Sequence, residues 1–256
     1  MTQSIITIPF KSYALSIPKA LNAIGADVIL KRQTDILIKP NLVNSSPFPV
    51  TTPVDCCAAL VDYIENCSRA NIIIAEGCGD PSLETEDIFS ILDYKKMARE
   101  KGVPLLDLNC APLERKTNPH CTFFPEFYLP QVTTTHYIIS VPVLKAHSYS
   151  KITGAMKNMM GFVPPKYYSG QYGFWKKALF HSDIHQAITE LNRYRRPDLS
   201  VMDATVGLAE FHLGGIECDP PVNRILAGYD PQAVDRRAAS LLGLDWRQIE
   251  HLTTPL

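Results

Sequence analysis

DILIKPNLVNSSPFPVTTPVDCCAALVDYIENCSRANIIIAEG, residues 35–77, places one amphipathic stretch between two short β-rich runs, DILIKPN (35–41) and NIIIAEG (71–77). Thr52 followed by Pro53 is typical of a helix N-cap and a first-turn proline. The residues that then recur at helical spacing are Val54, Cys57, Ala58, Val61 and Ile64. Two apolar runs joined by a helix predict parallel strands connected by a crossover.

The same alternation continues along the rest of the chain. The further apolar runs are SIITIP (4–9), VPLLDLN (103–109), YIISVPVL (137–144), LSVMDAT (199–205) and NRILAGYD (223–230). Asp230 and Pro231 begin another helical stretch, with Gly243 as its expected C-cap. The sequence therefore predicts an α/β fold with a mostly parallel sheet and crossover helices. Residues 1–256 would form a single module, or two lobes that divide near residues 111–135.

Composition excludes several classes of partner. The 25 basic and 26 acidic residues give a formal charge of -1, which leaves no excess positive charge for a nucleic acid or a membrane surface. No apolar run approaches the roughly 20 residues that span a bilayer. The start MTQSIITIPFKSY does not resemble a secretory signal, and the seven cysteines are an odd number. We therefore expect a soluble cytoplasmic protein with reduced thiols. Nothing in the pattern indicates an oligomeric state.

Polar side chains follow most of the apolar runs, at the point where each run ends. They are Lys39, Asn41, Glu76, Asp107, Asn109, Lys145, His147, Asp203 and Asp230. The carboxyl ends of parallel strands lie along one edge of a sheet, where open α/β folds bind ligands. Any single strand also ends in a polar loop without a functional reason, but the set as a whole favours a site at this edge.

VPVLKAHSYSKITGAMKNMMGFVPP, residues 141–165, contains two glycines in a stretch whose pattern predicts a helix over residues 151–161. Beside Lys151, one side of that helix would carry Gly154, Lys157, Asn158 and Gly161. The opposite side would be apolar. Glycine within a helix costs about 0.5–1 kcal/mol relative to alanine, so two glycines need a reason. We expect a floor of bare backbone between lysines, suited to a carboxylate or phosphate. A solvated basic face or a close crossing with a neighbouring element would also explain the pattern.

Amine and imidazole groups would supply the chemistry. His147 titrates near neutral pH and is the acid-base candidate, although a structural histidine is an alternative. Mutual repulsion among converging lysines should lower the pKa of at least one of them, which would give an amine that acts at neutral pH. Glu76 would be a base or the counter-ion of those lysines, and Asp203 would balance the remaining charge.

The predicted substrate is a small anionic metabolite, and the predicted reaction is proton transfer by an oxidoreductase or an isomerase. The catalytic candidates are His147, Lys157 and Glu76. The substrate-binding candidates are Lys39, Asn41, Lys145, Lys151, Gly154, Asn158 and Gly161. If a divalent metal takes part, its ligands would be His147, His181 and Asp203. Ser182 or Asp183 is the expected N-cap of the next helix, which would leave His181 outside that helix.

Two other features have plainer interpretations. Cys56 and Cys57 are adjacent within a predicted helix and are more typical of buried packing than of redox chemistry. KYYSGQYGFWKK, residues 166–177, is rich in aromatic residues and glycine. It would be either a loop that covers the site or an exposed aromatic patch for a partner protein.

Four segments resemble, in order, the family catalogued as domain of unknown function 362. They are ILIKPNLV (36–43), VPVLKAHSYSKITGAMKNMMG (141–161), HQAITELNRYRRPDLSVMDATVG (185–207) and ILAGYDPQAVDRRAASLLG (225–243). The motifs are Lys-x-His, Thr-Gly-Ala-x-Lys-Asn and Asp-Pro-x-Ala-x-Asp. The family is known mainly in association with ferredoxin-type iron-sulphur segments, which implies redox chemistry with a ferredoxin-like electron donor. The seven cysteines contain no Cys-x-x-Cys spacing, so we expect no cluster in this chain and electrons from a separate protein.

The chain is also remotely similar to the nickel-pincer lactate racemases, in which a lysine holds the cofactor and histidines ligate metal and move protons. That resemblance implies Lys157 as the anchoring lysine, with His147 and His181 as metal or acid-base groups. The alternative from another class is a non-enzymatic protein that carries a metal or docks an iron-sulphur protein through its aromatic stretch.

Overall fold

A single sheet forms the centre of the computed structural model, which describes residues 5–170 and 174–256. The parallel strands are β2 (Asp35–Pro40), β3 (Asn71–Glu76), β4 (Leu105–Asp107), β7 (Tyr137–Val141) and β10 (Leu199–Leu208). Two antiparallel strands complete the other edge, β11 (Arg224–Gly228) and β1 (Ile5–Pro9). The strand order is β1-β11-β10-β7-β2-β3-β4. This mixed, mostly parallel sheet with crossover helices confirms the predicted fold class.

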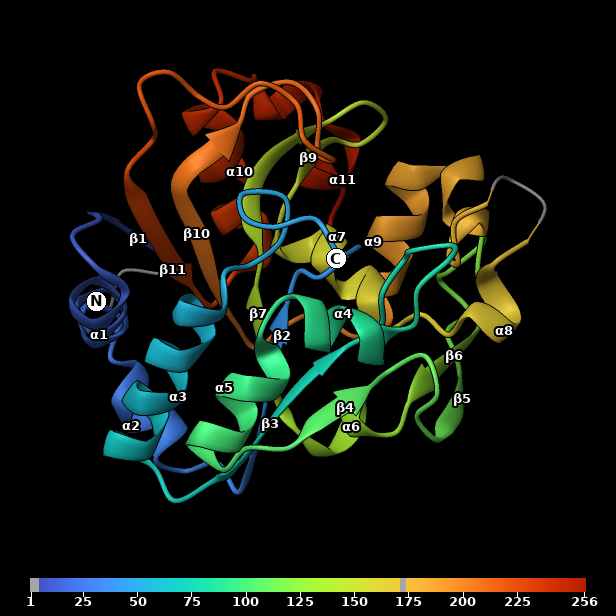
Figure 1. Ribbon diagram of the computed structural model, residues 1–256. Coiled ribbons are helices and arrows are strands. Elements are labelled where there is room, and N and C mark those ends of the chain that lie inside the picture. Colours follow the sequence, from blue (N-terminus) through green and yellow to red (C-terminus); the bar gives the residue numbers. More distant parts are fainter. Residues whose placement is uncertain (1–4, 171–173) are drawn as a thin grey trace.

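Two helical layers cover the sheet (Figure 1). One contains α1 (Tyr13–Ala23), α2 (Ala26–Leu30), α3 (Val54–Cys67), α4 (Thr85–Ile91) and α5 (Tyr94–Lys101). The other contains α6 (Val132–Thr135), α7 (Ala155–Asn158), α8 (Pro165–Tyr168), α9 (Ile184–Tyr194), α10 (Pro231–Leu241) and α11 (Glu250–Thr253), with the 3-10 turns η1 (Met159–Phe162), η2 (Ala178–Ser182) and η3 (Trp246–Gln248). In β2, Ile36 and Ile38 pack into the first layer and Leu37 into the second. This alternation shows why the strand is apolar on both faces.

The connection between β10 and β11 explains why the last predicted strand runs antiparallel. Residues 209–223 join the two strands without a helix, and a parallel return usually needs a longer crossover that contains one. β1 then pairs antiparallel with β11 at the sheet edge. Asp230 follows β11 and therefore lies at the opposite edge from the ends of the parallel strands. Its side chain caps α10 by accepting from the backbone N–H groups of Gln232 and Ala233, as predicted.

Three strands were not predicted. β5 (Leu113–Thr117) and β6 (Glu126–Pro130) form a separate two-stranded sheet within residues 111–135, where the two-lobe alternative would divide the chain. Phe127 and Leu129 of this sheet belong to the same apolar cluster as the central strands. The third strand, β9 (Lys151–Thr153), pairs antiparallel with β8 (Val143–His147), which continues β7 beyond Pro142.

The helix predicted over residues 151–161 is wrong in its first half. Residues 151–153 form strand β9, Gly154 is extended, and α7 begins only at Ala155. The turn before β9 is fixed by His147, whose Nδ1 accepts from the backbone N–H groups of Tyr149 and Ser150. A tight antiparallel turn therefore overrides the helical spacing of the apolar residues in this segment.

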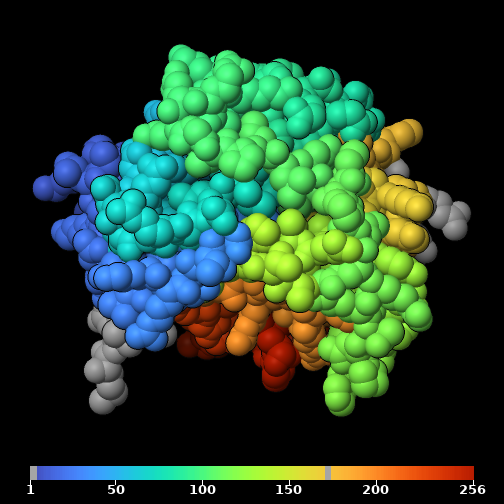
Figure 2. Space-filling view, turned by 90° about the horizontal axis from the view of Figure 1, so that it is seen from below, coloured from blue at the N-terminus to red at the C-terminus, as the bar shows by residue number. Residues whose placement is uncertain are grey.

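Other segments of the protein cover the edge of the sheet at which the parallel strands begin. Seen from below, residues of the first half of the chain, blue to green, occupy most of this face, and orange and red C-terminal segments lie at its lower margin (Figure 2). At this edge, two hydrogen bonds connect the segment before β10 with the start of β7. Arg195 Nε donates to the Thr133 carbonyl (2.7 Å), and Asp198 Oδ2 accepts from Ile138 N (2.7 Å). Among the described residues, no helix has the length and apolar character needed to cross a membrane.

Candidate active site

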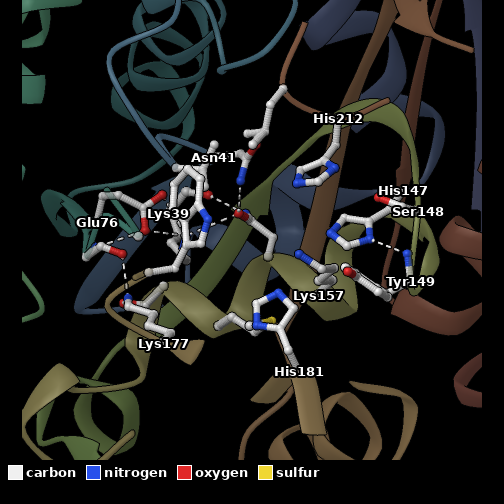
Figure 3. A pocket seen from close by; sticks show the side chains of 18 of the residues that line it. Lys39, Asn41, Glu76, His147, Ser148, Tyr149, Lys157, Lys177, His181 and His212 are labelled. Atoms are coloured by element: carbon white, nitrogen blue, oxygen red, sulfur yellow. Dashed lines mark hydrogen bonds and ion pairs between the residues drawn. The ribbon is translucent and has the colours of Figure 1, made fainter. Parts of the chain in front are cut away.

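A cavity of about 570 Å³ lies at the carboxyl ends of β2, β3 and β8. Figure 3 shows two groups of side chains in it: Lys39, Glu76 and Lys177 on one side, and three imidazoles around Lys157 on the other. The predicted site residues that line the cavity are Lys39, Asn41, Glu76, His147, Lys157, Asn158, Gly161 and His181. The parallel strand ends thus place residues from distant segments around one space.

Lys39 and Glu76 form a buried ion pair on the first side of the cavity. Lys39 Nζ lies 2.7 Å from Glu76 Oε1 and also donates to Asn158 Oδ1 (3.1 Å). The Glu76 oxygens additionally accept from the backbone N–H groups of Leu42 and Gly77, both at 2.8 Å. Because both carboxylate oxygens are occupied, this geometry favours the counter-ion role of Glu76 over the role of a base.

Gly161 is a glycine because the ion pair lies against its backbone. A Cβ at this position would overlap with Glu76 Oε1 and with Lys39 Cε. The Gly161 carbonyl also accepts from Lys177 Nζ (2.9 Å). The space beside the bare backbone of residue 161 is therefore filled by the Lys39 and Glu76 side chains.

Lys145 lies behind the cavity wall. Its Nζ donates to Asn41 Oδ1 (2.7 Å) and to the Val50 carbonyl (2.6 Å). Burial, together with the nearby charge of Lys157, lowers the pKa of Lys145 to about 7. The predicted N-cap Thr52 lies close by and does not cap α3: its hydroxyl accepts from Asn41 N (2.8 Å) and donates to the Val141 carbonyl, which ties the ends of β2 and β7 together.

Lys157 is half-buried on α7 and its ammonium group faces the cavity. Among the described residues, its Nζ has no hydrogen-bond or ion-pair partner. Burial lowers the pKa of Lys157 to about 8. The cavity thus contains a cation that no protein anion neutralises.

The imidazoles beside Lys157 are held in their neutral form. His147 accepts two backbone N–H groups at Nδ1, at 3.1 and 3.2 Å, so this hydrogen-bond pattern assigns its proton to Nε2. Its ring stacks on His212 with a centroid separation of 3.9 Å. Burial and then the charge of Lys157 lower the pKa of His147 and His181, and lower that of His212 to about 3.

Lys151 and Gly154 lie outside the cavity. Lys151 is exposed on β9, because the strand and turn rotate it away from the face that a helix would have given it. Gly154 packs against the buried carboxylate of Asp235, which accepts from Ala155 N (2.6 Å) and Met156 N (3.0 Å). A close crossing, one of the alternatives above, therefore explains Gly154.

Of the three predicted metal ligands, His147 and His181 line the cavity and Asp203 does not. Asp203 lies within β10, where its carboxylate accepts from the Tyr13 hydroxyl (2.6 Å) and from Thr205, and it does not line the cavity. Within residues 5–170 and 174–256, no group of three or more His, Cys, Asp or Glu side chains is placed to hold a metal ion. His147 would also have to give up its backbone hydrogen bonds or its Nε2 proton to become a ligand. His147, His181 and Lys157, the residues that the resemblance to lactate racemases names, all line the same cavity.

The cavity residues outside the predicted catalytic, substrate-binding and metal-binding sets include Trp175, Lys177 and His212. Lys177 Nζ bridges the carbonyls of Gly77 (2.5 Å) and Gly161 (2.9 Å), and burial lowers its pKa to about 7. Trp175 and Lys177 belong to the aromatic segment 166–177, of which residues 171–173 lie outside the described residues. Their position agrees with a segment that covers the site. The Nδ1 of His212 is buried without a partner, and no motif around it marks the residue in the sequence.

His181 precedes α9, whose N-cap is Asp183, as predicted. His185 on that helix instead pairs with His251, their Nδ1 atoms lying 2.8 Å apart. Cys56 and Cys57 are buried in the apolar cluster beneath α3, which confirms the packing interpretation.

Comparison with known proteins agrees with this architecture. The chain is similar to the lactate racemase apoprotein from Thermoanaerobacterium thermosaccharolyticum, with a TM-score of 0.59 and 12% sequence identity over 92% of this chain and 56% of that chain. The chain thus spans little more than half the length of that protein, and the likeness is one of fold. No curated protein matches the chain. A family model described as "Domain of unknown function (DUF362)" matches residues 36–240, which include the cavity segments and the three motifs. The chain therefore belongs to the DUF362 family.

Proposed function

We propose that the protein is an enzyme that acts on a small anionic metabolite, a carboxylate or a phosphate, by proton transfer assisted by lysine and histidine. The observation that carries the proposal is the Lys157 ammonium group, which faces the cavity without a protein anion beside it. The fold shared with a lactate racemase apoprotein supports a small carboxylate as the substrate class.

The charge balance around the cavity favours an anionic ligand. Glu76 is paired with Lys39 and saturated by backbone N–H groups. Within residues 5–170 and 174–256, the hydrogen-bond partners of Lys145 and Lys177 are neutral oxygen atoms. Burial lowers the pKa values of these lysines, and the nearby Glu76 carboxylate offsets only part of that shift. A bound carboxylate or phosphate would supply the missing negative charge and raise those pKa values again.

The imidazoles divide the proton-transfer roles between them. His147 carries its proton on Nε2 and would donate a hydrogen bond to the substrate. His181 and His212 are neutral at pH 7, and each keeps an unprotonated ring nitrogen that can accept a proton. General acid-base catalysis of this kind contributes about 10²–10⁴-fold to a rate.

Thermal denaturation with acetate, D- and L-lactate and phosphate tests the binding step. A ligand at one hundred times its Kd stabilises the folded state by about 2.7 kcal/mol. We expect this stabilisation in the wild type and in Lys96→Met, which removes an exposed lysine on α5, and not in Lys157→Met. Stabilisation of Lys157→Met equal to the wild type would refute the role of Lys157. Absence of stabilisation in every protein would favour the non-enzymatic alternative.

Solvent hydrogen exchange tests the proton-transfer step. When the protein is incubated with D- or L-lactate in D2O, the α-hydrogen of lactate should be replaced by deuterium, which proton NMR follows as a loss of signal. His212→Phe should slow this exchange and still bind the anion. Exchange in His212→Phe at the wild-type rate would assign the base to another residue.

A further inference from the structure

We propose that the Lys157 amine is a nucleophile that forms an imine with the carbonyl carbon of a 2-oxo acid. This inference rests on the proposed function, because the carboxylate of such a substrate is the anion that the cavity would bind. It adds that the substrate carries an aldehyde or ketone group beside its carboxylate.

The contacts of the four lysines around the cavity distinguish Lys157 from the others. Lys39 Nζ is held by Glu76, Asn158 and the Pro40 carbonyl. Lys145 and Lys177 each donate to two oxygen atoms of the protein. In the part of the chain that the structure describes, only Lys157 has an Nζ without such acceptors, so it is the amine that an incoming carbonyl group could reach.

The surroundings of Lys157 make its ammonium group easier to deprotonate than that of an exposed lysine. Met160, Trp175 and Phe211 contribute apolar surface to the same cavity. The one carboxylate among the lining residues, Glu76, is already paired with Lys39. A lysine that is desolvated among apolar groups and lacks a counter-ion loses its proton near neutral pH and becomes nucleophilic, which agrees with its lowered pKa of about 8.

The imidazoles are placed to assist both halves of the condensation. In the first half, the neutral amine forms a C–N bond to the carbonyl carbon, and the carbonyl oxygen receives a proton, which gives a carbinolamine. In the second half, that hydroxyl takes a further proton from the solvent and leaves as water, and the nitrogen lone pair forms the iminium double bond, so the condensation consumes one proton overall. His181 or His212 can accept the proton that the nitrogen releases in the first half and return it to the oxygen. The Nε2–H of His147 donates a hydrogen bond to that oxygen and keeps its proton. The iminium keeps a positive charge, so the substrate carboxylate retains its partner.

Reductive trapping tests the inference. Wild-type protein is incubated with pyruvate or glyoxylate and sodium cyanoborohydride, which reduces an iminium to a stable secondary amine, and the adduct is located by peptide mass spectrometry. We expect one adduct, at Lys157. Lys157→Arg keeps the positive charge but cannot form the imine, so it should bind acetate and lose the adduct. Lys96→Met should be trapped as the wild type is.

The outcomes separate this inference from the proposed function. Stabilisation by acetate or lactate without a trapped adduct would refute imine formation and leave anion binding intact. Adducts spread over exposed lysines, or retained in Lys157→Arg, would also refute it. If Lys157→Arg does not fold, as judged by circular dichroism, the adduct map of the wild type alone decides, because a map without Lys157 overturns the proposal.

Discussion

Replacing Gly154 by alanine should destabilise the protein only as long as Asp235 is present. Gly154 has an extended backbone, φ -148° and ψ -161°, which alanine adopts without strain. A Cβ on it would lie 2.5 Å from Asp235 Oδ2 and closer still to Oδ1 and Cγ. The Asp235 side chain is buried, so it can make room only by leaving its two hydrogen bonds to Ala155 N and Met156 N.

The size of the effect follows from those two hydrogen bonds. Burial raises the pKa of Asp235 to about 7, so the group is ionised in a buffer well above that pH. Under that condition a hydrogen bond to the charged group is worth about 1.5–3 kcal/mol, so displacing the carboxylate should cost about 3–6 kcal/mol. Asp235→Ala removes the same two acceptors and should cost a similar amount. In the double variant there is no Asp235 side chain for the alanine to overlap with. Alanine at position 154 should then cause no further loss of stability, because it lowers the conformational entropy of the unfolded chain, an effect that favours the folded state by about 0.4–1 kcal/mol relative to glycine. The two substitutions should therefore be strongly non-additive.

Urea denaturation of the wild type, both single variants and the double variant completes the cycle. We expect the double variant to be about as stable as Asp235→Ala alone, which gives a coupling energy of roughly 3–6 kcal/mol. Since Asp235 fixes the start of the helix that carries Lys157, acetate binding should weaken in all three variants. Additive losses of stability, or a Gly154→Ala variant as stable as the wild type, would refute this account of the glycine.

Two further predictions concern the buried charges. Lys39→Met should lower the free energy of unfolding by about 3–5 kcal/mol, because it leaves Glu76 as an uncompensated buried carboxylate. Adding Glu76→Gln should restore part of that loss in urea denaturation, and a double variant less stable than Lys39→Met would contradict this explanation. The pKa values of Lys145, Lys157 and Lys177 in the folded state, about 7, 8 and 7, lie below that of an unfolded lysine, so these groups bind more protons in the unfolded state above about pH 7. The pKa values of the cysteine thiols are raised in the folded state, so they act in the opposite sense above about pH 8. The free energy of unfolding should therefore rise between about pH 7 and pH 8. Urea denaturation in zwitterionic buffers measures this slope; a fall across the same window would contradict the prediction, and Lys177→Met should reduce the slope.

Much of the fold could be predicted because its signals are local. The parallel strands are continuous apolar runs bounded by polar residues, since both faces of the sheet are covered, and helix starts such as Asp230 with Pro231 depend on neighbouring residues alone. The direction of β11 and the pairing of β5 with β6 depend instead on connections and long-range contacts. An apolar run looks the same in either direction, so the sequence pattern could not distinguish them.

The site residues that were predicted correctly also depend on local signals, and those that were missed depend on long-range contacts. Lys39, Glu76 and His147 were predicted to be neighbours because parallel strand ends converge whatever the loops do. Lys151 and Gly154 were placed by helical spacing, and that inference failed where a hairpin held by the His147 ring replaced the first turn. His212 and Lys177 reach the cavity from turns whose paths no periodicity specifies.

The glycines of residues 141–165 show how one sequence signal can have two physical causes. Both avoid an overlap with a buried carboxylate, Gly154 with Asp235 and Gly161 with Glu76. The first of these carboxylates orients the segment that carries Lys157, and the second neutralises Lys39 and so leaves Lys157 as the cation that still lacks a partner. The glycines thus act on the ligand indirectly, because they admit the carboxylates that position and isolate the reactive lysine. A substitution at either glycine should therefore weaken anion binding even though neither Cα needs to touch the anion.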